Sequence, residues 1–174
     1  YRDGRQPGPV FEAGCFAHAR RKLFELADVE GAVRKKSRGE RTEQIYPIAL
    51  EAVQRLDALF DIERRVNGLP SQERLTARQE HSAPLMADLH AWLHAQLARL
   101  SRNHDLAKAI NYMLRRWPAF ARFLEDGRVC ITNNAAERAL RGVTLGRKSW
   151  LFCGSDRGGQ RAAVMYSLIG TAKL

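Results

Sequence analysis

Glu137 is the residue of this sequence best placed to do chemistry, because it stands as a single acid among basic side chains. A short apolar stretch at 129–131 leads into Asn133-Asn134, a good pair for capping a helix start, and Glu137 follows within the first turn. A hard cation such as Mg²⁺ prefers oxygen ligands on rigid elements, and Arg138 and Arg141 could hold a phosphodiester beside it. The pattern therefore indicates phosphate chemistry.

The same residues also have a purely structural interpretation. Asn134-x-x-Glu137 has the spacing of a capping box, in which the glutamate returns a hydrogen bond to the backbone N–H of the cap residue. Spacing alone favours the capping role. The two roles do not exclude each other, so both stay open at this point.

Four segments, in the same order, extend the pattern over nearly the whole chain. They are Gly14–Lys22, Asp126–Arg141 with its run Asn-Asn-Ala-Ala-Glu-Arg-Ala-Leu-Arg, Gly146–Phe152 and Tyr166–Lys173. Together these segments resemble the transposases of the insertion sequence 66 family, which are bacterial DDE enzymes. The run around Glu137 is a specific signal rather than a generic one.

The resemblance implies that Glu137 is the third acid of a metal-binding triad. The two aspartates that complete the triad are expected upstream of Tyr1, and Asp3, the only early candidate, lies in a sequence typical of a turn. The chain is therefore expected to be a C-terminal-side fragment, inactive by itself, of an enzyme that uses Mg²⁺ or Mn²⁺.

The implied reaction is cleavage and transfer of DNA strands by two metal ions. The implied partners are transposon ends and target DNA, with a homo-oligomer assembling on the DNA and no membrane involved. The basic residues expected to contact DNA are Arg138, Arg141, Arg147, Lys148, Arg157 and Arg161.

The predicted fold class is α+β and mostly helical, and the resemblance implies a partial ribonuclease-H-like domain with an all-helical insertion. Residues 1–40 are assigned to the core as a strand and a helix, 41–126 to the helical insertion, and 127–174 to a return to the core with the third acid and a closing helix. Strands are predicted at Val10–Phe16 and Val129–Ile131, and the alternating pattern of Arg147–Cys153 predicts a short strand or an extended segment.

Helices are predicted from apolar periodicity and from Gly and Pro signals. The expected positions are Ala17–Leu26, an apolar stripe from Ile45 to Glu63 that ends near Asn67-Gly68, a helix from Ser71 that Pro84 kinks or splits, Asp105–Arg116, a new start at Trp117-Pro118 that runs to Glu125, and a closing helix over Gln160–Lys173.

Composition agrees with a nucleic-acid partner. The 174 residues carry a formal net charge of +10 with a pI of about 10.2, which favours a polyanion. Residues 127–174 hold eight basic and two acidic side chains. No apolar run is long enough for a membrane span, and Cys15, Cys130 and Cys153 are too few and too far apart for a disulfide framework. A bacterial cytoplasmic location is expected.

Two histidine patterns are weaker candidates for metal sites. Cys15-x-x-His18 is half of a zinc site at best, because zinc needs four ligands and no second pair is suitably spaced. His90 and His94 lie four residues apart on a predicted helix, but no third ligand is evident. A structural role for the first pair and a solvated helix face for the second are the favoured interpretations.

Two further stretches could contact DNA. The loop 154–159 could offer backbone N–H groups to a phosphate, with a plain turn as an equal alternative. Lys148, Trp150 and Phe152 combine charge with aromatic surface suited to stacking on bases, although aromatic residues at alternate positions more often belong to a core. Two other functions stay open for the whole chain, namely a non-catalytic DNA-binding remnant of a decayed transposase and a helical interaction module.

Overall fold

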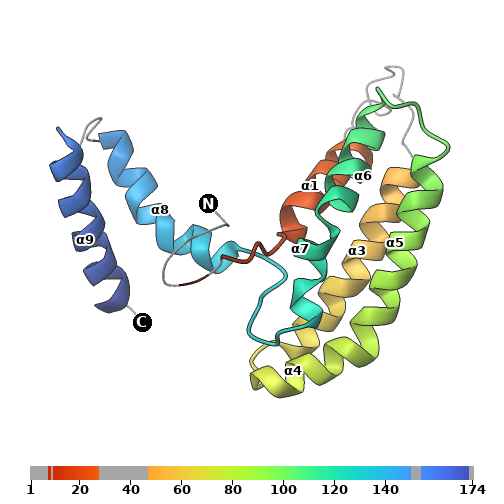
Figure 1. The fold of residues 1–174 in the computed structure, drawn as a ribbon, viewed down its shortest axis with the longest axis horizontal. Coiled ribbons are helices and arrows are strands. Elements are labelled where there is room, and N and C mark those ends of the chain that lie inside the picture. Colours follow the sequence, from red (N-terminus) through yellow and green to blue (C-terminus); the bar gives the residue numbers. More distant parts are fainter. Residues whose placement is uncertain (1–7, 9, 28–46, 150–153, 173–174) are drawn as a thin grey trace, which may run out of the picture. The chain divides into compact units, whose positions relative to one another are not determined.

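The computed structural model describes residues 8, 10–27, 47–149 and 154–172, and it divides into two compact units, Tyr1–Thr132 and Asn133–Leu174. The first unit is a packed group of helices (Figure 1). Its elements are α1 (Phe16–Ala27), α3 (Pro47–Val66), α4 (Ser71–Ala77), the π-helical turn η1 (Arg78–Ser82), α5 (Ala83–Leu97), α6 (Asp105–Arg115), α7 (Trp117–Ala121) and the 3-10 turn η2 (Arg122–Leu124).

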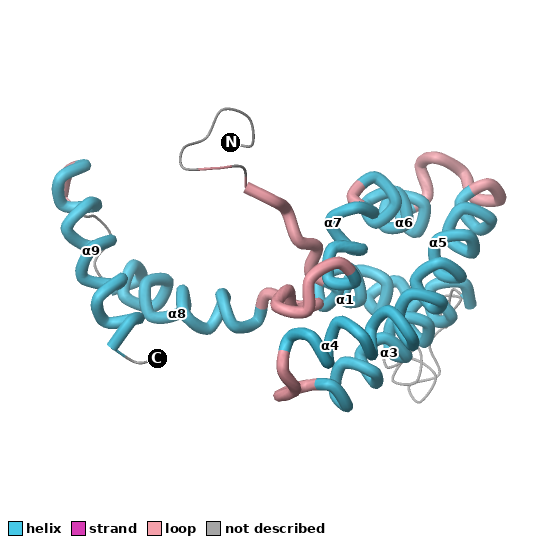
Figure 2. Tube along the Cα trace, turned by 60° about the horizontal axis from the view of Figure 1, so that its bottom comes forward, coloured by secondary structure: helices cyan, strands magenta, loops and turns pink. Residues whose placement is uncertain are grey.

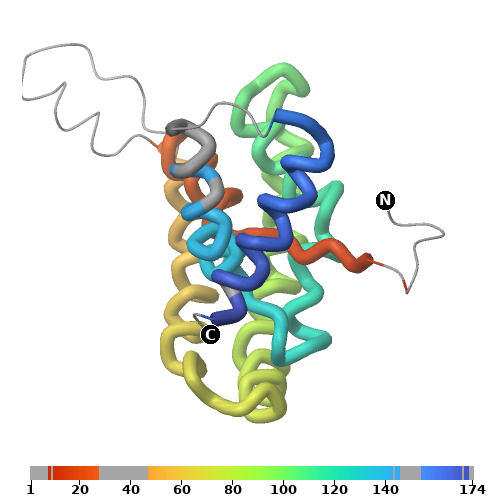
Figure 3. The backbone as a smooth tube through the Cα atoms, turned by 90° about the vertical axis from the view of Figure 1, so that its left-hand side faces the viewer, coloured from red at the N-terminus to blue at the C-terminus, as the bar shows by residue number. Residues whose placement is uncertain are grey.

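The core of this unit comes from apolar stripes at helical spacing. In α3, Ala49, Ala52, Leu56 and Leu59 recur every three or four residues, and each is buried. These residues pack in one cluster with the buried faces of α1, α5 and α6. Figures 1 and 3 show α3 and α5 running side by side, joined at one end through α4.

Phe16 joins the start of α1 to the last helical turns of the unit. Its ring meets Phe120 edge-on at 5.0 Å and Phe123 at 5.6 Å, in the perpendicular arrangement that aromatic pairs favour. All three rings are buried. The core therefore brings together residues more than 100 positions apart in the sequence.

Pro84 interrupts the helix that begins at Ser71, as predicted. Proline has no backbone N–H and its ring clashes with the carbonyl four residues earlier, so a regular α-helix does not continue through it. The chain widens into the π-helical turn η1, in which the N–H of Ala83 donates to the carbonyl of Arg78 five residues back. The regular helix resumes as α5.

Other predicted helix boundaries are also confirmed. Gly68 has a φ of 86°, a conformation that glycine adopts at low cost, and it follows the end of α3 at Val66. The predicted new start at Trp117-Pro118 is α7, which tightens into η2 before Glu125. The beginning of the predicted stripe, at Ile45, lies outside the described residues.

The predicted α+β class is wrong, because the described part of the chain holds helices and loops but no strand and hence no ribonuclease-H-like sheet (Figure 2). The predicted strands Val10–Phe16 and Val129–Ile131 are instead loop segments that form no strand ladder, and Phe16 is the first residue of α1. Single backbone hydrogen bonds hold them instead: the Gly14 N–H donates to the Ala119 carbonyl at 2.8 Å, and the Phe16 N–H donates to the Ile131 carbonyl at 2.9 Å. The apolar residues reflect burial of Phe16 and Ile131 in a helical core.

The third predicted strand, Arg147–Cys153, is also wrong where the structure describes it. Residues 147–149 form the last turn of helix α8 (Asn134–Ser149), and 150–153 lie outside the described residues. The helix passes through Gly142 and Gly146 without ending and includes the first three residues of the predicted strand. The three-part division at residues 40 and 126 stays a prediction.

The second unit contains α8 and the closing helix α9 (Asp156–Ala172), which starts four residues before the predicted Gln160. Their described side chains are exposed or half-buried, and none is buried. Large apolar residues lie at the surface of both helices, namely Leu140, Leu145, Val164, Met165, Leu168 and Ile169. Across the described helices of both units, none combines the length and apolar character needed to cross a membrane.

Candidate functional site

The first turn of α8 carries the candidate acid. The N–H of Glu137 donates to the carbonyl of Asn133 at 2.9 Å, which makes Asn133 the residue that precedes the helix and caps it. Glu137 is then the fourth helical residue, whereas a capping box places its glutamate third. The register therefore differs by one residue from the predicted Asn134-x-x-Glu137 box.

Glu137 shares one face of α8 with the two arginines predicted to hold phosphates. Positions three and four residues apart are neighbours on a helix surface, so Arg141 lies next to both Glu137, four residues before it, and Arg138, three residues before it. All three side chains are exposed. An open hollow of about 550 Å³ on this helix is lined by Asn134, Glu137, Arg138, Leu140, Arg141 and Thr144.

The electrostatics of this face suit an anion held near a cation site. The N-terminus of a helix carries a partial positive charge, which stabilises the Glu137 carboxylate and equally favours a phosphate. Arg138 and Arg141 add two guanidinium groups, each able to donate two hydrogen bonds to one phosphate. We name Glu137, Arg138 and Arg141 together the α8 acid–base face.

The other predicted DNA contacts lie on the same unit. Arg157 and Arg161 are exposed and one turn apart near the start of α9. The backbones of Arg147 and Lys148 belong to the last turn of α8, but their side chains lie outside the described residues. Trp150 and Phe152, the proposed stacking residues, lie outside them as well.

The loop predicted at 154–159 is shorter than expected, because α9 begins at Asp156. Gly154 has a φ of 77°, and the side-chain oxygen of Ser155 accepts a hydrogen bond from the N–H of Gly158 at 3.2 Å. Ser155 therefore caps α9 and occupies one of the backbone donors that a phosphate would use. Local capping accounts for this turn.

Within the described residues, no cluster of three His, Cys, Asp or Glu side chains could hold a metal ion. The rings of His90 and His94 lie 4.6 Å apart, and the ring of Trp117 lies 4.5 Å from that of His90. His90 is thus half-buried against an aromatic side chain. Burial, and secondarily the neighbouring His94, lowers the pKa of His90 below its ordinary value of 6.5.

Sequence reasoning did not single out Arg78, which is fully buried in the first unit. Its guanidinium forms an ion pair with Glu63 and donates to backbone carbonyls between residues 123 and 129. Its partners are 15 to 51 positions away in the sequence, so local spacing carried no signal for it. An arginine inside a predicted helix usually lies at the surface.

Comparisons with known proteins match the chain to one protein family and to several relatives. The family model described as Transposase IS66 family matches residues 1–161. Uncharacterized protein y4hP of Sinorhizobium fredii (strain NBRC 101917 / NGR234) is 57% identical over 166 residues, 95% of this chain and 30% of that protein. Uncharacterized protein y4jD of the same strain is 37% identical over 174 residues, 100% of this chain and 31% of that protein.

The chain thus spans less than a third of the length of these relatives. No solved structure matches it significantly.

Proposed function

Because the chain belongs to the Transposase IS66 family, we propose that it is part of an enzyme that cleaves DNA strands and joins them to new sites. The observation that carries the proposal is the α8 acid–base face. It exposes one carboxylate and two guanidinium groups on a single helix within the matched region.

Glu137 would bind a divalent cation, Mg²⁺ or Mn²⁺, through its carboxylate oxygens. Such a cation, when bound, polarises phosphate oxygens and lowers the pKa of water. A single carboxylate fills only one of the cation's ligand positions. The described residues contain no cluster of three His, Cys, Asp or Glu side chains that could hold a metal ion. The proposal therefore requires further carboxylates from outside these residues.

Arg138 and Arg141 would hold the phosphates next to the cleaved bond, and Arg157 and Arg161 would contact flanking DNA. Arg147 and Lys148 are proposed for the same role. These side chains supply positive charge without reading base edges, so they would position DNA rather than select its sequence. We propose transposon ends and target DNA as partners, assembly of several copies on DNA, and the bacterial cytoplasm as the location.

The test replaces the proposed ligand in a protein of the relatives' length that contains this segment. Glu137→Gln removes the charge that binds the cation but keeps an oxygen that can accept a hydrogen bond. We expect metal-dependent nicking of a transposon-end duplex to fall by at least about 100-fold, because the loss of a metal ligand affects the chemical step directly. DNA affinity and thermal stability should stay close to wild type.

Asp156→Asn is the matched control, because Asp156 is also an exposed acid in the first turn of a helix. Asp156→Asn removes the same favourable interaction with a helix dipole. Any fall in its nicking activity therefore measures that effect alone. Near-normal nicking by Glu137→Gln would rule out the ligand role. Equal losses in both variants would assign Glu137 to helix stability. Absence of nicking in the wild-type protein, with DNA still bound, would favour a non-catalytic remnant.

A further inference from the structure

Two aromatic rings lie open on the surface of the first unit. Phe11 is 66% exposed, more than any other large apolar side chain in the described part of the chain, and Tyr112 is 41% exposed. Phe11 belongs to the loop segment before α1, and Tyr112 lies on the outer face of α6. A single exposed apolar residue needs no explanation, but these two rings share further features.

A guanidinium group lies over one face of each ring. The central carbon of Arg122 is 4.8 Å from the ring centroid of Phe11, and that of Arg116 is 5.2 Å from the ring centroid of Tyr112. Because each ring is also exposed, its opposite face is left to solvent. Both rings therefore present an open π-face and have a cation behind them, an arrangement that aromatic rings favour.

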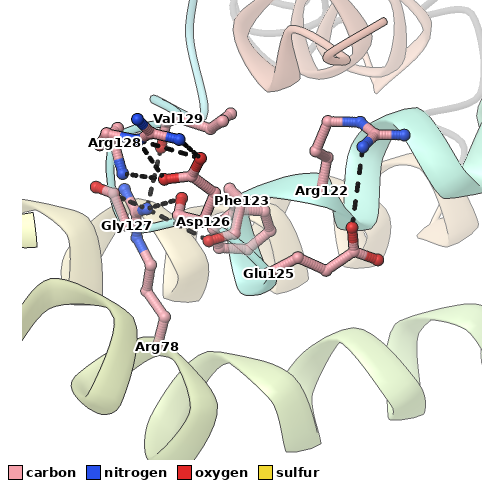
Figure 4. Close-up of polar contacts among 8 residues, drawn as sticks. All are labelled: Arg78, Arg122, Phe123, Glu125, Asp126, Gly127, Arg128 and Val129. Atoms are coloured by element: carbon pink, nitrogen blue, oxygen red, sulfur yellow. Dashed lines mark hydrogen bonds and ion pairs between the residues drawn. The ribbon is translucent and has the colours of Figure 1, made fainter. Parts of the chain in front are cut away.

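Glu12 joins the two arrangements. Nη1 of Arg116 donates to the Glu12 carboxylate at 3.0 Å, and Nε of Arg122 donates to the Glu12 backbone carbonyl at 3.0 Å. Nη1 of Arg122 also lies 3.8 Å from the carboxylate of Glu125 (Figure 4). Both guanidinium groups are thus held by contacts of their own, which fixes the ring faces that they cover.

The segment that carries Phe11 is fixed on the helices. The N–H of Gly14 donates to the carbonyl of Ala119 in α7 at 2.8 Å, and a Cβ atom on Gly14 would lie 2.7 Å from the ring of Phe120. The ring of Phe120 meets that of Tyr112 edge-on at 6.1 Å. The two open rings therefore border the same part of the packed core, and little conformational freedom would be lost when they bind a ligand.

The surroundings of the rings are basic. Arg115 and Arg116 are exposed on α6 beside Tyr112, and Arg115 forms no ion pair with any residue that the structure describes. Aromatic rings next to arginines are a common means of holding single-stranded nucleic acid, because every base has a π-face and its backbone is negative. Inside a duplex the base faces are covered by their neighbours, so only an unpaired base can stack on a protein ring.

We propose that Phe11 and Tyr112, which we name the ring pair, form a stacking surface for unpaired bases of the DNA on which the enzyme acts. The choice of DNA as the ligand rests on the proposed function, whereas the surface itself involves no residue of α8. Cleavage and transfer of strands create DNA ends. A terminal base has a stacked neighbour on one side only, so it leaves the duplex at a lower cost than an internal base.

The experiment measures DNA binding, without metal, by a protein of the relatives' length that contains this segment. The two DNAs are a fully paired transposon-end duplex and the same duplex with a single-stranded thymidine extension. Stacking is worth about fivefold or more in affinity for each base, so the wild type should bind the extended duplex at least about 30-fold more tightly. Phe11→Leu with Tyr112→Leu removes both π-faces and should abolish this preference.

The double variant removes no charge and keeps apolar side chains. Its affinity for the paired duplex should therefore stay within about twofold of wild type, and the dependence of that affinity on salt should not change. Phe11→Trp and Tyr112→Phe each keep a π-face, so each should keep the preference for the extended duplex. A melting temperature close to that of the wild type is expected for every variant, because both replaced side chains are exposed.

Phe24→Leu is the matched control. Phe24 is 36% exposed on α1, and its ring also lies beside an arginine, with the central carbon of Arg20 5.4 Å from its centroid. The control should bind both DNAs as the wild type does. A second measurement needs no variant to fold: 5-iodouracil placed in the extension and irradiated with the wild-type protein should attach to peptides that contain Phe11 or Tyr112.

The inference would be overturned if the wild type bound both DNAs equally tightly, if the double variant kept the preference, or if Phe24→Leu lost as much of it. Crosslinks confined to other peptides would also overturn it. Altered sedimentation of the double variant, with its DNA preference unchanged, would assign the ring pair to contacts between protein chains instead. A wild-type protein that prefers the extended duplex but nicks no DNA with either metal would refute the proposed enzyme and leave the ring pair as a DNA contact.

Discussion

The two units of this chain use their side chains in different ways. The first buries an apolar cluster contributed by α1, α3, α5 and α6 and places a fully buried ion pair beside it. In the second, the described side chains of α8 and α9 are exposed or half-buried, although several are large and apolar. Burial of apolar surface is the main favourable term in folding, so the first unit has its own source of stability.

The residues that stabilise the fold and the residues proposed to bind metal and phosphates therefore lie in different parts of the sequence. The acid and the arginines proposed for catalysis and DNA contact lie on the unit whose described residues form no buried core. The fully buried ion pair of Arg78 with Glu63 lies in the well-packed unit. Substitutions in the two units should therefore have different effects, which can be measured independently.

The largest difference is expected between Leu56→Ala and the double substitution Arg138→Ala with Arg141→Ala. Leu56 is 0% exposed, so its truncation leaves a cavity and should cost about 2–5 kcal/mol of unfolding free energy. The arginines are exposed, and their loss should change stability by about 0.5 kcal/mol or less each. Urea unfolding measures both effects.

DNA binding should show the reverse order. Loss of two phosphate contacts should make the plot of log affinity against log salt shallower by about two units, while Leu56→Ala leaves the slope unchanged. Arg64→Ala with Arg65→Ala, two exposed arginines on α3, is the matched control for the lost charge. An equal change in slope for both double variants would show that α8 has no special part in binding DNA.

Replacing a glycine with alanine should have opposite effects on stability in the two units. Gly127→Ala forces a Cβ against the Ser71 carbonyl and should destabilise the first unit by about 1–3 kcal/mol or more. Gly142 lies inside α8 with no atom within 4 Å of an added Cβ, so Gly142→Ala should stabilise that helix by about 0.5–1 kcal/mol. Thermal unfolding followed by circular dichroism, with amide exchange to locate the change, measures both. Destabilisation by Gly142→Ala would mean that another surface packs on this side of α8.

The helices could be predicted from sequence because their causes are local. Apolar residues at helical spacing identified α3, and Gly68 and Pro84 marked where helices end or break. The strand predictions were wrong because an apolar segment looks the same in sequence whether it joins a sheet or packs on helices as a loop. Val129–Ile131 is of the second kind, since its carbonyls face Arg78 and Phe16 rather than a neighbouring strand.

For functional residues too, only those placed by local sequence signals could be predicted. The position of Glu137 in the first turn of α8 followed from Asn133-Asn134, a local capping signal, although the register differed by one residue. Arg78 could not be predicted because its contacts join α3, η1 and the turn at residues 123–129, which only the folded chain brings together. Local chemistry could be predicted from the sequence, whereas long-range contacts could not.

The smallest expected effect is a pH dependence confined to the first unit, which holds all five histidines of the chain. Burial against Trp117 lowers the pKa of His90 in the folded state, so the unfolded chain binds this proton more readily. Stability should therefore fall as the pH drops below 6.5 and level off once the pH is below the folded-state pKa. His90→Gln should remove this part of the slope in urea unfolding measured from about pH 8 to about pH 5, while amide exchange in α9, corrected for its intrinsic pH dependence, stays the same. Identical slopes for the wild type and His90→Gln would show that His90 titrates alike in both states.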